Sequence, residues 1–472
     1  MKILFAASEA VPFIKTGGLG DVAGALPAEL NKLENDTRVI LPLYGDIVEK
    51  YRTTMSYVGS TVVSLSWRNQ YCGVFEQVLD GVKYYFIDNE YYFKRSGLYG
   101  FYDDGERFAF FARAVLEVLP LIDFYPDVLH ANDWHTALIP VFLDAFYIHR
   151  EEYKNIKTLY TIHNIEFQGK YGRDIIGDVL GLPEEKVSIV DYAGCVNYMK
   201  GAIEASNAVS TVSKSYSQEI LDPFYAYGLE DILRRKKDKI HGVVNGIDTN
   251  VFNPKRDKAL FKNYDKKSVE DKKENKKGLC EMLNISYRED VPVIAMITRL
   301  TEQKGFDLVI RVIEDIMCRD VQLVVLGTGD WRYETKLRDV EQKYQNKMRA
   351  LITFSADLAQ KLYASSDMFL MPSKFEPCGL SQMIAMRYGS VPIVRETGGL
   401  RDTVVPFNGE KGTGFTFYSY NAYDMLGAID RAIAVYNDKE SWKKVVENGM
   451  KADFSWKKSA KEYVKIYEKL IK

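Results

Sequence analysis

The sequence predicts an α/β protein with two Rossmann-like domains, each built on a parallel β-sheet. A chain of 472 residues is too long for one ordinary hydrophobic core, so two domains are the default expectation. Short apolar runs alternate along the chain with segments of helical periodicity, which is the β-loop-α rhythm of parallel sheets. Residues 366–400 hold two such units in direct succession, with strands expected at 368–371 and 391–394.

The first half of the chain begins with a strand and then alternates strands and helices. Strands are expected at residues 2–7, 37–41, 127–131, 157–162, 207–212 and 240–244, and helices from about residue 21 and over 108–119. Pro27 should bend or limit the first helix, because proline has no backbone N–H. Residues 59–87 alternate apolar and polar positions, which predicts β-hairpins with turns at Gly73 and Gly81. Residues 88–107 are expected to form a loop, and Ser213 should cap a helix.

The second half repeats the same rhythm. Further strands are expected at residues 291–297, 321–326 and 351–354, and helices from about 306, over 379–389 and from about 457 to the end. Residues 255–277 are rich in Lys, Asp and Glu, which predicts a solvated, partly helical surface segment. We place the domain change near residue 245. Residues 1–245 then form the first domain, residues 246–456 the second, and residues 457–472 a terminal helix.

Composition argues against several classes of function. The 63 basic and 65 acidic residues give a net charge of −2, which gives no electrostatic case for a nucleic-acid or membrane partner. Five scattered cysteines form no C-x-x-C pair, which argues against a zinc site and fits a reducing cytoplasm. The N-terminal apolar run breaks at Ser8 and Glu9, too soon for a signal peptide. No run approaches the roughly 18 apolar residues of a membrane helix.

Two glycine-rich loops are the first candidate binding elements. The loop after the first expected strand ends K-T-G-G-L-G-D, with Lys15 at its rim and Gly17 and Gly18 in the turn. Glycine allows the backbone to approach a ligand closely. The same T-G-G-L string recurs from Thr397, again between a strand and a helix. Neither loop has the G-x-G-x-x-G spacing, and G-T-G-D at 327–330 lacks the third glycine, so a nicotinamide cofactor is not supported.

Acidic and histidine side chains follow other expected strands. Glu376 lies just before the helix that begins with Gly379 and Leu380, whose backbone N–H groups suit a phosphate. A lone Glu at a helix start more often only complements the helix dipole. In the first half, Asp133 and His163 follow two strands of one sheet, although a His at a strand end is more often structural. In open α/β sheets, ligands bind beyond these carboxyl ends.

Seven motifs in a fixed order are much more specific than any one of these loops alone. The strings K-T-G-G-L-G-D, N-D-W-H, H-N-I-E-F-Q-G, V-N-G-I-D, T-R-L-T-E-Q-K-G, S-K-F-E-P-C-G-L and E-T-G-G-L occur in this order. This series resembles the bacterial glycogen synthases and plant starch synthases over most of the chain. The resemblance implies a glycosyltransferase-B fold with two Rossmann-like domains facing a deep cleft. It also implies retaining transfer of glucose from ADP-glucose to the non-reducing end of glycogen or another α-1,4-glucan, in the cytoplasm.

The resemblance also implies roles for individual residues. The catalytic set is Glu376, His163, Arg299, Lys304 and Asp133. The donor-binding set is Lys15, Gly17, Gly18, Asn245, Arg299, Lys304, Phe354, Cys378, Gly379, Leu380 and Thr397. The acceptor side comprises Asp21, Asn164, Trp134 and His135, and the terminal helix crosses back onto the first domain.

The expected chemistry involves no metal and no cofactor. A departing diphosphate needs its growing charge neutralised, and the chain has no D-x-D motif to hold a metal. Arg299, Lys304 and Lys15, with backbone N–H groups near Gly18 and Leu380, supply fixed positive charge instead. Because no second carboxylate stands opposite Glu376, we expect attack on the same face, with the departing phosphate taking the proton of the acceptor.

Two departures from the family pattern and two alternatives remain at this point. Phe252 replaces the usual Trp, and Phe354 replaces the usual Tyr that stacks on the base. One alternative is a related glycosyltransferase that uses UDP-glucose or another acceptor, because the sequence does not fix the base. The other is a glucan-binding protein with a dead site, although an intact Lys15, Arg299, Lys304 and Glu376 argues against it.

Overall fold

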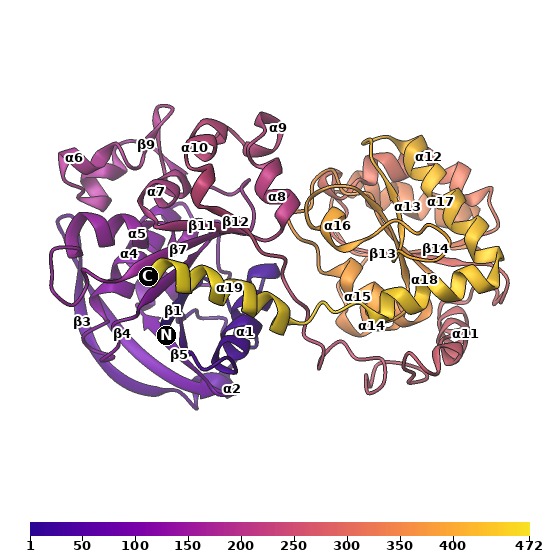
Figure 1. The fold of residues 1–472 in the computed structure, drawn as a ribbon, viewed down its shortest axis with the longest axis horizontal. Helices are drawn as coiled ribbons and strands as arrows, with labels where there is room; N and C mark the ends of the chain where they lie inside the picture. The colour runs from indigo at the N-terminus through magenta and orange to yellow at the C-terminus, as the bar shows by residue number, and fades with distance from the viewer. The chain divides into compact units, whose positions relative to one another are not determined.

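The computed structural model describes every residue from Met1 to Lys472 and divides into two compact units. Unit 1 comprises Met1–Gly246 and Trp456–Lys472, and unit 2 comprises Ile247–Ser455. Both chain ends therefore lie in unit 1, where Figure 1 marks them. No helix in the structure has the length and apolar character needed to cross a membrane.

Unit 1 is built on a nine-stranded sheet with the order β12-β11-β7-β6-β1-β2-β5-β4-β3. Its strands are β1 (Lys2–Ala6), β2 (Asp36–Pro42), β3 (Ser56–Leu65), β4 (Arg68–Leu79), β5 (Val82–Asp88), β6 (Val128–Asn132), β7 (Lys157–Ile162), β11 (Ala208–Thr211) and β12 (Ile240–Gly242). The strands from β12 to β5 are parallel, and β4 and β3 add an antiparallel edge. The central strands are almost entirely buried, as expected where helices cover both faces of a sheet.

The helices and minor elements of unit 1 surround this sheet (Figure 1). They are α1 (Gly18–Asn31), α2 (Glu49–Arg52), α3 (Glu90–Phe93), α4 (Asp104–Glu117), η1 (Trp134–Thr136), α5 (Leu138–Phe142), η2 (Leu143–Tyr147), η3 (Ile176–Leu180), α6 (Glu184–Val187), α7 (Tyr198–Ala205), α8 (Lys214–Glu219), α9 (Pro223–Ala226), α10 (Glu230–Arg235), η4 (Lys237–Lys239) and α19 (Trp456–Ile471). A small separate sheet joins β8 (Lys170–Tyr171), β10 (Cys195–Asn197) and β9 (Asp191–Tyr192).

Several local predictions for unit 1 need correction. Helix α1 begins at Gly18 and continues through Pro27, because its buried apolar side chains keep it packed despite the missing N–H. Gly73 lies inside β4, and the hairpin turn falls at Ser66, whose φ is 53°. Residues 88–107 contain α3 and the start of α4 rather than a continuous loop.

Two turn and cap predictions for unit 1 are confirmed. The turn at Gly81 has positive φ at both Asp80 and Gly81, as a two-residue hairpin turn requires. Ser213 caps α8, because its side chain accepts a hydrogen bond from the backbone N–H of Tyr216 at 3.1 Å. Both are short-range features, which the local sequence specifies.

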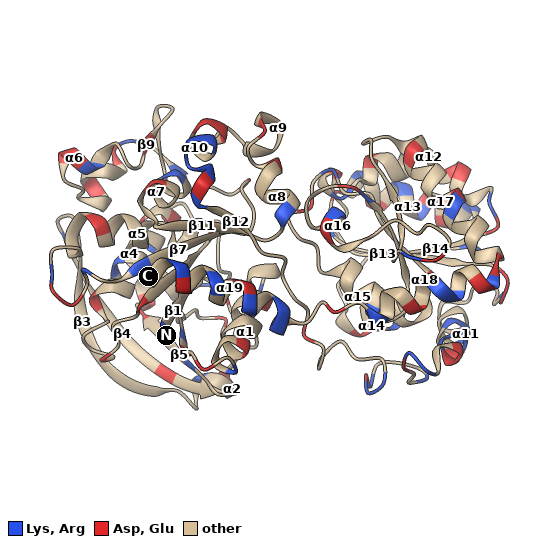
Figure 2. Cartoon of the chain, in the orientation of Figure 1, with Lys and Arg blue, Asp and Glu red and all other residues tan.

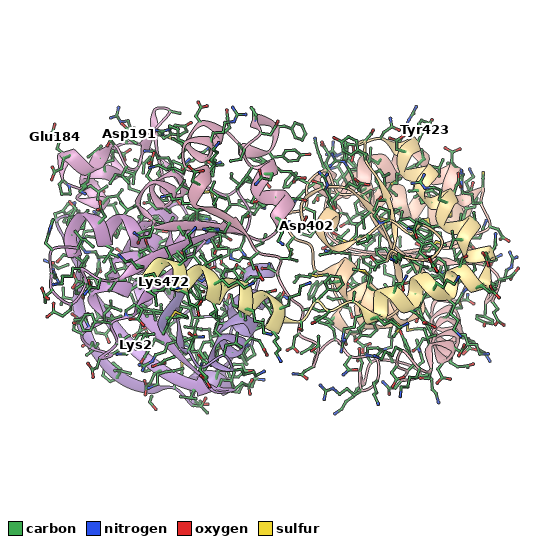
Figure 3. The ribbon with its side chains drawn as sticks, in the orientation of Figure 1. Lys2, Glu184, Asp191, Asp402, Tyr423 and Lys472 are labelled. Carbon is green, nitrogen blue, oxygen red and sulfur yellow. The ribbon has the colours of Figure 1, made fainter.

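Helix α19 returns from unit 2 and packs on unit 1. It contacts α1, and the hydroxyl of Tyr467 lies 2.8 Å from Nδ1 of the buried His130 on β6. Ser459 donates to the backbone oxygen of Val244 at 2.6 Å. In Figure 3 the final residue, Lys472, lies at the end of α19 over unit 1. These contacts fix α19 to unit 1.

We expect Tyr467→Phe to lower the stability of unit 1 by about 1 kcal/mol, because it removes one partner of a buried hydrogen bond. For a domain of this size the melting transition should fall by about 2–4 °C. Differential scanning calorimetry measures the shift. Tyr102→Phe is the control, because Tyr102 is 93% exposed. An equal shift in both variants would contradict the anchoring role of Tyr467.

Unit 2 is built on a six-stranded sheet that is parallel throughout, with the order β15-β14-β13-β16-β17-β18. Its strands are β13 (Val293–Ile297), β14 (Gln322–Leu326), β15 (Met348–Leu351), β16 (Met368–Met371), β17 (Val391–Arg395) and β18 (Phe415–Phe417). Its helices are η5 (Val269–Asp271), α11 (Lys272–Leu283), η6 (Glu302–Lys304), α12 (Phe306–Met317), α13 (Trp331–Lys343), α14 (Ala356–Ser365), α15 (Ser381–Arg387), α16 (Gly398–Thr403), α17 (Ala422–Asn437) and α18 (Lys439–Lys451). Counted within the unit, the strand order is 3-2-1-4-5-6, that of a doubly wound fold.

Two expectations for unit 2 are wrong. The strand expected at 351–354 lies at Met348–Leu351, and Phe354 follows it in a loop because Ser355 already caps α14. The segment 255–277 is not simply solvated, since Lys272 and Lys276 are buried. The Lys272 ammonium donates to the backbone oxygens of Tyr363, Ala364 and Tyr388, and desolvation lowers its pKa to about 7. The Lys276 ammonium pairs with Asp367 at 2.9 Å.

The parallel part of each sheet has one point where the strand order reverses. In unit 1 the reversal lies between β1 and β6, and in unit 2 between β13 and β16. Ligands of doubly wound sheets bind at the carboxyl ends of the strands beside such a point. The loops after β1, β6, β13 and β16 are therefore where functional residues are expected.

Candidate functional site

In unit 2, two loops bring a carboxylate and an ammonium group together at the reversal point. The loop after β13 carries Lys304, and the loop after β16 carries Glu376. Lys304 Nζ lies 2.6 Å from Glu376 Oε2, and the two side chains are only 17% and 8% exposed. Ser373 donates a second hydrogen bond to the same oxygen at 3.0 Å. The carboxylate is thus fixed by two donors, one of them charged.

Backbone contacts fix the path of the Glu376 loop. The Lys374 N–H donates to the backbone oxygen of Gln303 at 2.8 Å, and the Lys374 ammonium pairs with Glu302 at 2.8 Å. Arg395 donates to the backbone oxygen of Lys374 at 2.6 Å. The backbone hydrogen bond between Lys374 and Gln303 therefore joins the Glu376 loop to the Lys304 loop, whereas the Lys374–Glu302 pair is exposed and adds little to this link.

The glycines after Thr397 are required by the close approach of this loop. The Gly399 N–H donates to the backbone oxygen of Glu376 at 3.0 Å. A Cβ at Gly398 would lie 2.0 Å from that same oxygen, and one at Gly399 would lie 2.0 Å from the oxygen of Cys378. Any side chain there would displace the loop that carries Glu376. The E-T-G-G-L string therefore supports the carboxylate structurally.

The same two loops carry further hydrogen-bond donors. Arg299 is exposed and forms no ion pair within the chain. The backbone N–H groups of Gly379 and Leu380 have no acceptor within the chain, whereas Gln382 donates to the oxygens of Cys378 at 3.1 Å and Gly379 at 2.9 Å. A guanidinium and two free N–H groups can together bind an anion such as a diphosphate.

A cavity of about 240 Å³ opens beside Arg299 at the carboxyl ends of β13, β14 and β15. Its walls are largely apolar and are formed by Ile297, Thr298, Arg299, Leu326, Gly327, Thr328, Thr353, Phe354, Ser355, Ala356 and Ala359. Phe354 is 92% exposed at this site, so its ring is available for stacking. The volume is below the roughly 300–1,000 Å³ of pockets for whole drug-sized ligands. The cavity therefore has room for one ring system and not for a whole nucleotide sugar.

In unit 1, the loop after β1 is organised by a residue that the sequence analysis missed. Buried Glu9 accepts hydrogen bonds from the Thr16 backbone N–H, from the Thr16 hydroxyl at 2.9 Å and from the Gly17 N–H at 3.3 Å. Burial raises the pKa of Glu9, and these hydrogen bonds oppose the shift. The Gly17 N–H therefore already has an acceptor, and no local pattern marks Glu9 as that acceptor.

Lys15 and Asp21 form an ion pair at the rim of the same loop. Lys15 Nζ lies 2.6 Å from Asp21 Oδ2, and the side chains are 44% and 31% exposed. An exposed pair of this kind contributes only about 0–1 kcal/mol, so Lys15 can exchange it for a more highly charged partner. Gly18 begins α1 directly beside them.

The loops after β6 and β7 meet at Asp133 and His163. Asp133 has φ 57° and ψ 179°, a conformation that costs roughly 1–3 kcal/mol outside glycine. Its Oδ1 accepts from the backbone N–H groups of His163 at 2.8 Å and Asn164 at 3.4 Å, and the His163 ring contacts Asn132 Oδ1 at 2.9 Å. Burial lowers the pKa of His163 to about 3 and raises that of Asp133 to about 7. His163 is therefore neutral at pH 7.

Three other predicted site residues of unit 1 are buried. Trp134 is 9% exposed, and His135 stacks on Tyr99 at 4.3 Å with Phe108 at its edge. Burial holds the pKa of His135 well below its usual range. Asn245 is 6% exposed, and its side-chain oxygen has no hydrogen-bond partner. The remaining predicted residues lie in loops that follow strands, except Gly18 and Asp21, which lie in α1.

Comparisons with known proteins identify both halves of the chain. The family model "Starch synthase catalytic domain" matches residues 2–235, and "Glycosyl transferases group 1" matches residues 284–451. The glycogen synthase of Anoxybacillus flavithermus is 50% identical, covering 100% of this chain and 98% of its own. That of Clostridium novyi is 51% identical over 100% of this chain and 99% of its own. The family resemblance inferred from the motifs is thus confirmed.

Solved structures support the fold assignment. The catalytic domain of starch synthase IV from Arabidopsis thaliana, solved with ADP and acarbose, has a TM-score of 0.90 and 32% identity, covering 100% of this chain and 99% of that one. A sucrose-phosphate synthase from Thermosynechococcus elongatus has a TM-score of 0.63 at 15% identity, over 99% of this chain and 98% of that one, and shows the fold alone. The chain belongs to the glycogen synthase and starch synthase family of glycosyltransferases, with the glycosyltransferase-B fold.

Proposed function

We propose that this enzyme transfers glucose from ADP-glucose to the non-reducing end of glycogen or another α-1,4-glucan, with retention of configuration. The observation that carries the proposal is the Lys304–Glu376 pair at the reversal point of the unit 2 sheet, with Arg299 on the same loop as Lys304. The ADP and acarbose in the Arabidopsis structure support a nucleotide donor and a glucan acceptor for this chain.

In the proposed donor site, Arg299, Lys304 and Lys15 neutralise the diphosphate together with the N–H groups of Gly379 and Leu380. Phe354 stacks on the base over the apolar cavity. Thr397, Cys378, Gly17, Gly18 and Asn245 complete the donor-binding set. Because the N–H of Gly17 is already bonded to Glu9, Gly17 would act by shaping the loop and not by donating to the ligand.

Catalysis follows from where charge develops. As the bond to the diphosphate breaks, the sugar gains oxocarbenium character, which a nearby carboxylate stabilises. Glu376 supplies that carboxylate, and Lys304 shields it in the ground state while facing the departing diphosphate. The leaving phosphate oxygen takes the proton of the attacking glucan hydroxyl, so no second protein base is needed. His163 holds the donor sugar, and Asp133 lies near the acceptor. Asp21, Asn164, Trp134 and His135 belong to the acceptor side.

The decisive assay offers the purified chain ADP-glucose or UDP-glucose with glycogen and measures the released nucleotide. We expect ADP release that depends on glycogen and greatly exceeds UDP release. Preferred UDP release would favour the related transferase. No release from either donor, with glycogen binding intact, would favour a glucan-binding protein with a dead site.

Other partners are not expected. Figure 2 shows Lys and Arg interspersed with Asp and Glu over the helices of each unit, which supports the prediction of no nucleic-acid partner. A cytoplasmic location likewise remains a prediction of the sequence.

Activity should not depend on a divalent metal, because arginine, lysine and backbone N–H groups replace it at the diphosphate. Turnover measured after exhaustive treatment with EDTA should equal that of the untreated enzyme. Enzyme dialysed without chelator is the control for losses on handling. A large loss that only Mg²⁺ or Mn²⁺ restores would contradict the metal-free mechanism.

A further inference from the structure

The end of β6 and the loop after it hold His163 by its ring and by its backbone. The backbone N–H of His163 donates to Asp133 Oδ1 at 2.8 Å, and ring Nε2 lies 2.9 Å from Asn132 Oδ1. The Asp133 N–H in turn donates to the oxygen of Thr161 at 2.9 Å, so the ends of β6 and β7 are joined in both directions. The position of the imidazole is therefore set by two consecutive residues, the last of β6 and the first after it.

The orientation of the Asn132 amide follows from its other contacts. Asn132 is fully buried, and its Nδ2 donates to the backbone oxygens of Ala6 at 3.1 Å and His130 at 3.3 Å. Only the NH₂ group of an asparagine can donate, so it must face these two oxygens. The side-chain oxygen is then the atom that faces His163. Thr136 fixes the backbone of Asn132 as well, since its hydroxyl contacts both the N–H and the oxygen of Asn132.

This orientation decides which ring nitrogen of His163 carries the proton. An amide oxygen accepts but does not donate, so Nε2 must bear the hydrogen. The neutral imidazole has a single N–H, which leaves Nδ1 as a bare acceptor. Nδ1 of His163 forms no hydrogen bond within the chain, and it is not fully buried. It is therefore the ring atom available to a ligand.

We propose that Asn132 is a positioning residue that fixes His163 as the Nε2–H tautomer, so that Nδ1 accepts a hydrogen bond from a hydroxyl of the donor sugar. This inference rests on the proposed function, in which His163 contacts that sugar. It also gives the interaction a direction. The sugar hydroxyl donates and the ring accepts, so the His163 ring orients the substrate and does not act as a general acid.

The tautomer can be tested by NMR without any measurement of activity. The full chain is labelled with ¹⁵N-histidine, and His163 is assigned among the five histidines by comparison with His163→Gln. We expect the wild-type spectrum at pH 7 to show a protonated Nε2 and an unprotonated Nδ1. Asn132→Leu should give His163 a mixture of tautomers. A wild-type spectrum with the proton on Nδ1 would overturn the proposal.

Kinetics supply the second readout. Asn132→Leu should lower kcat by about tenfold with little change in the KM for ADP-glucose, because a misplaced catalytic contact costs rate. Asn31→Leu is the matched control. The Asn31 amide, at the end of α1, also donates to two backbone oxygens, those of Thr37 and Gly81. It should change neither the His163 signals nor kcat. Unchanged signals and kcat in Asn132→Leu would remove Asn132 from this role.

A smaller variant keeps the test decisive if Asn132→Leu does not fold. Asn132→Ala adds no bulk at this buried position and leaves His163 Nε2 without its acceptor, so it should also give His163 a mixture of tautomers. An unchanged tautomer in Asn132→Ala would contradict the role of Asn132, and the wild-type spectrum reports the tautomer without any substitution. Full activity of His163→Gln would instead remove His163 from the proposed reaction, and with it this role of Asn132, whatever the tautomer.

Discussion

Glu376→Ala is expected to lower kcat by about 10²–10³-fold while ADP binding stays nearly intact. Removal of one preorganised group from a developing charge costs rate of this order. The carboxylate is 8% exposed and fixed by Lys304 and Ser373, so it is preorganised before the substrate arrives. Because we assign it to the sugar and its transition state, its loss should appear in kcat and not in the affinity for the nucleotide. Glycogen-dependent ADP release and calorimetric titration with ADP measure the two quantities.

Two further variants separate the charge of Glu376 from its structural contacts. Glu376→Gln keeps the shape and can still accept from Lys304, so a loss as large as that of Glu376→Ala would show that the negative charge matters. Glu302→Ala is the matched control, because Glu302 pairs with Lys374 on the outside of the same loop. It should leave kcat within the ordinary range of surface substitutions. Near wild-type kcat in Glu376→Ala would show that Glu376 has only a structural role before the helix and takes no part in catalysis.

The sequence predicts best the elements whose signals are local. Strand β16 begins and ends where the apolar run at 368–371 does, because Pro372 stops it. Helix α12 begins at Phe306 as expected. The ion pair of Lys304 and Glu376 was not visible as a contact, but both residues were expected in loops that follow strands of one parallel sheet. Topology alone brings such ends together.

The features that the sequence did not reveal depend on distant parts of the chain. Lys272 looked like part of a solvated charged run, yet the backbone oxygens that it binds lie about ninety or more positions later, at Tyr363, Ala364 and Tyr388. Glu9 appeared only as the end of an apolar run, although it organises the Lys15 loop. The strained backbone of Asp133 is held by the neighbouring strand β7. No local periodicity encodes contacts of these kinds.

Lys15→Ala should weaken donor use by roughly ten- to a hundredfold. A charge-assisted hydrogen bond contributes about 1.5–3 kcal/mol, and each ~1.4 kcal/mol is tenfold in affinity. In the structure the Lys15 ammonium is paired with Asp21, and both groups are partly exposed. That pair is weak in water, so a diphosphate with its higher charge can replace or join Asp21 as the partner of Lys15. The loss should appear in kcat/KM for ADP-glucose.

The nature of the contact is tested by the choice of replacement at Lys15. Lys15→Gln should behave like Lys15→Ala, because reach without charge does not hold a diphosphate, whereas Lys15→Arg should recover part of the loss with its different head group. Lys32→Ala is the matched control. Lys32 is exposed and ion-paired with Glu29 at the far end of α1, the helix that follows the Lys15 loop. It should leave kcat/KM unchanged. If all three variants of Lys15 also match the wild type, Lys15 is a solvated loop residue and the donor diphosphate is held by Arg299, Lys304 and the backbone alone.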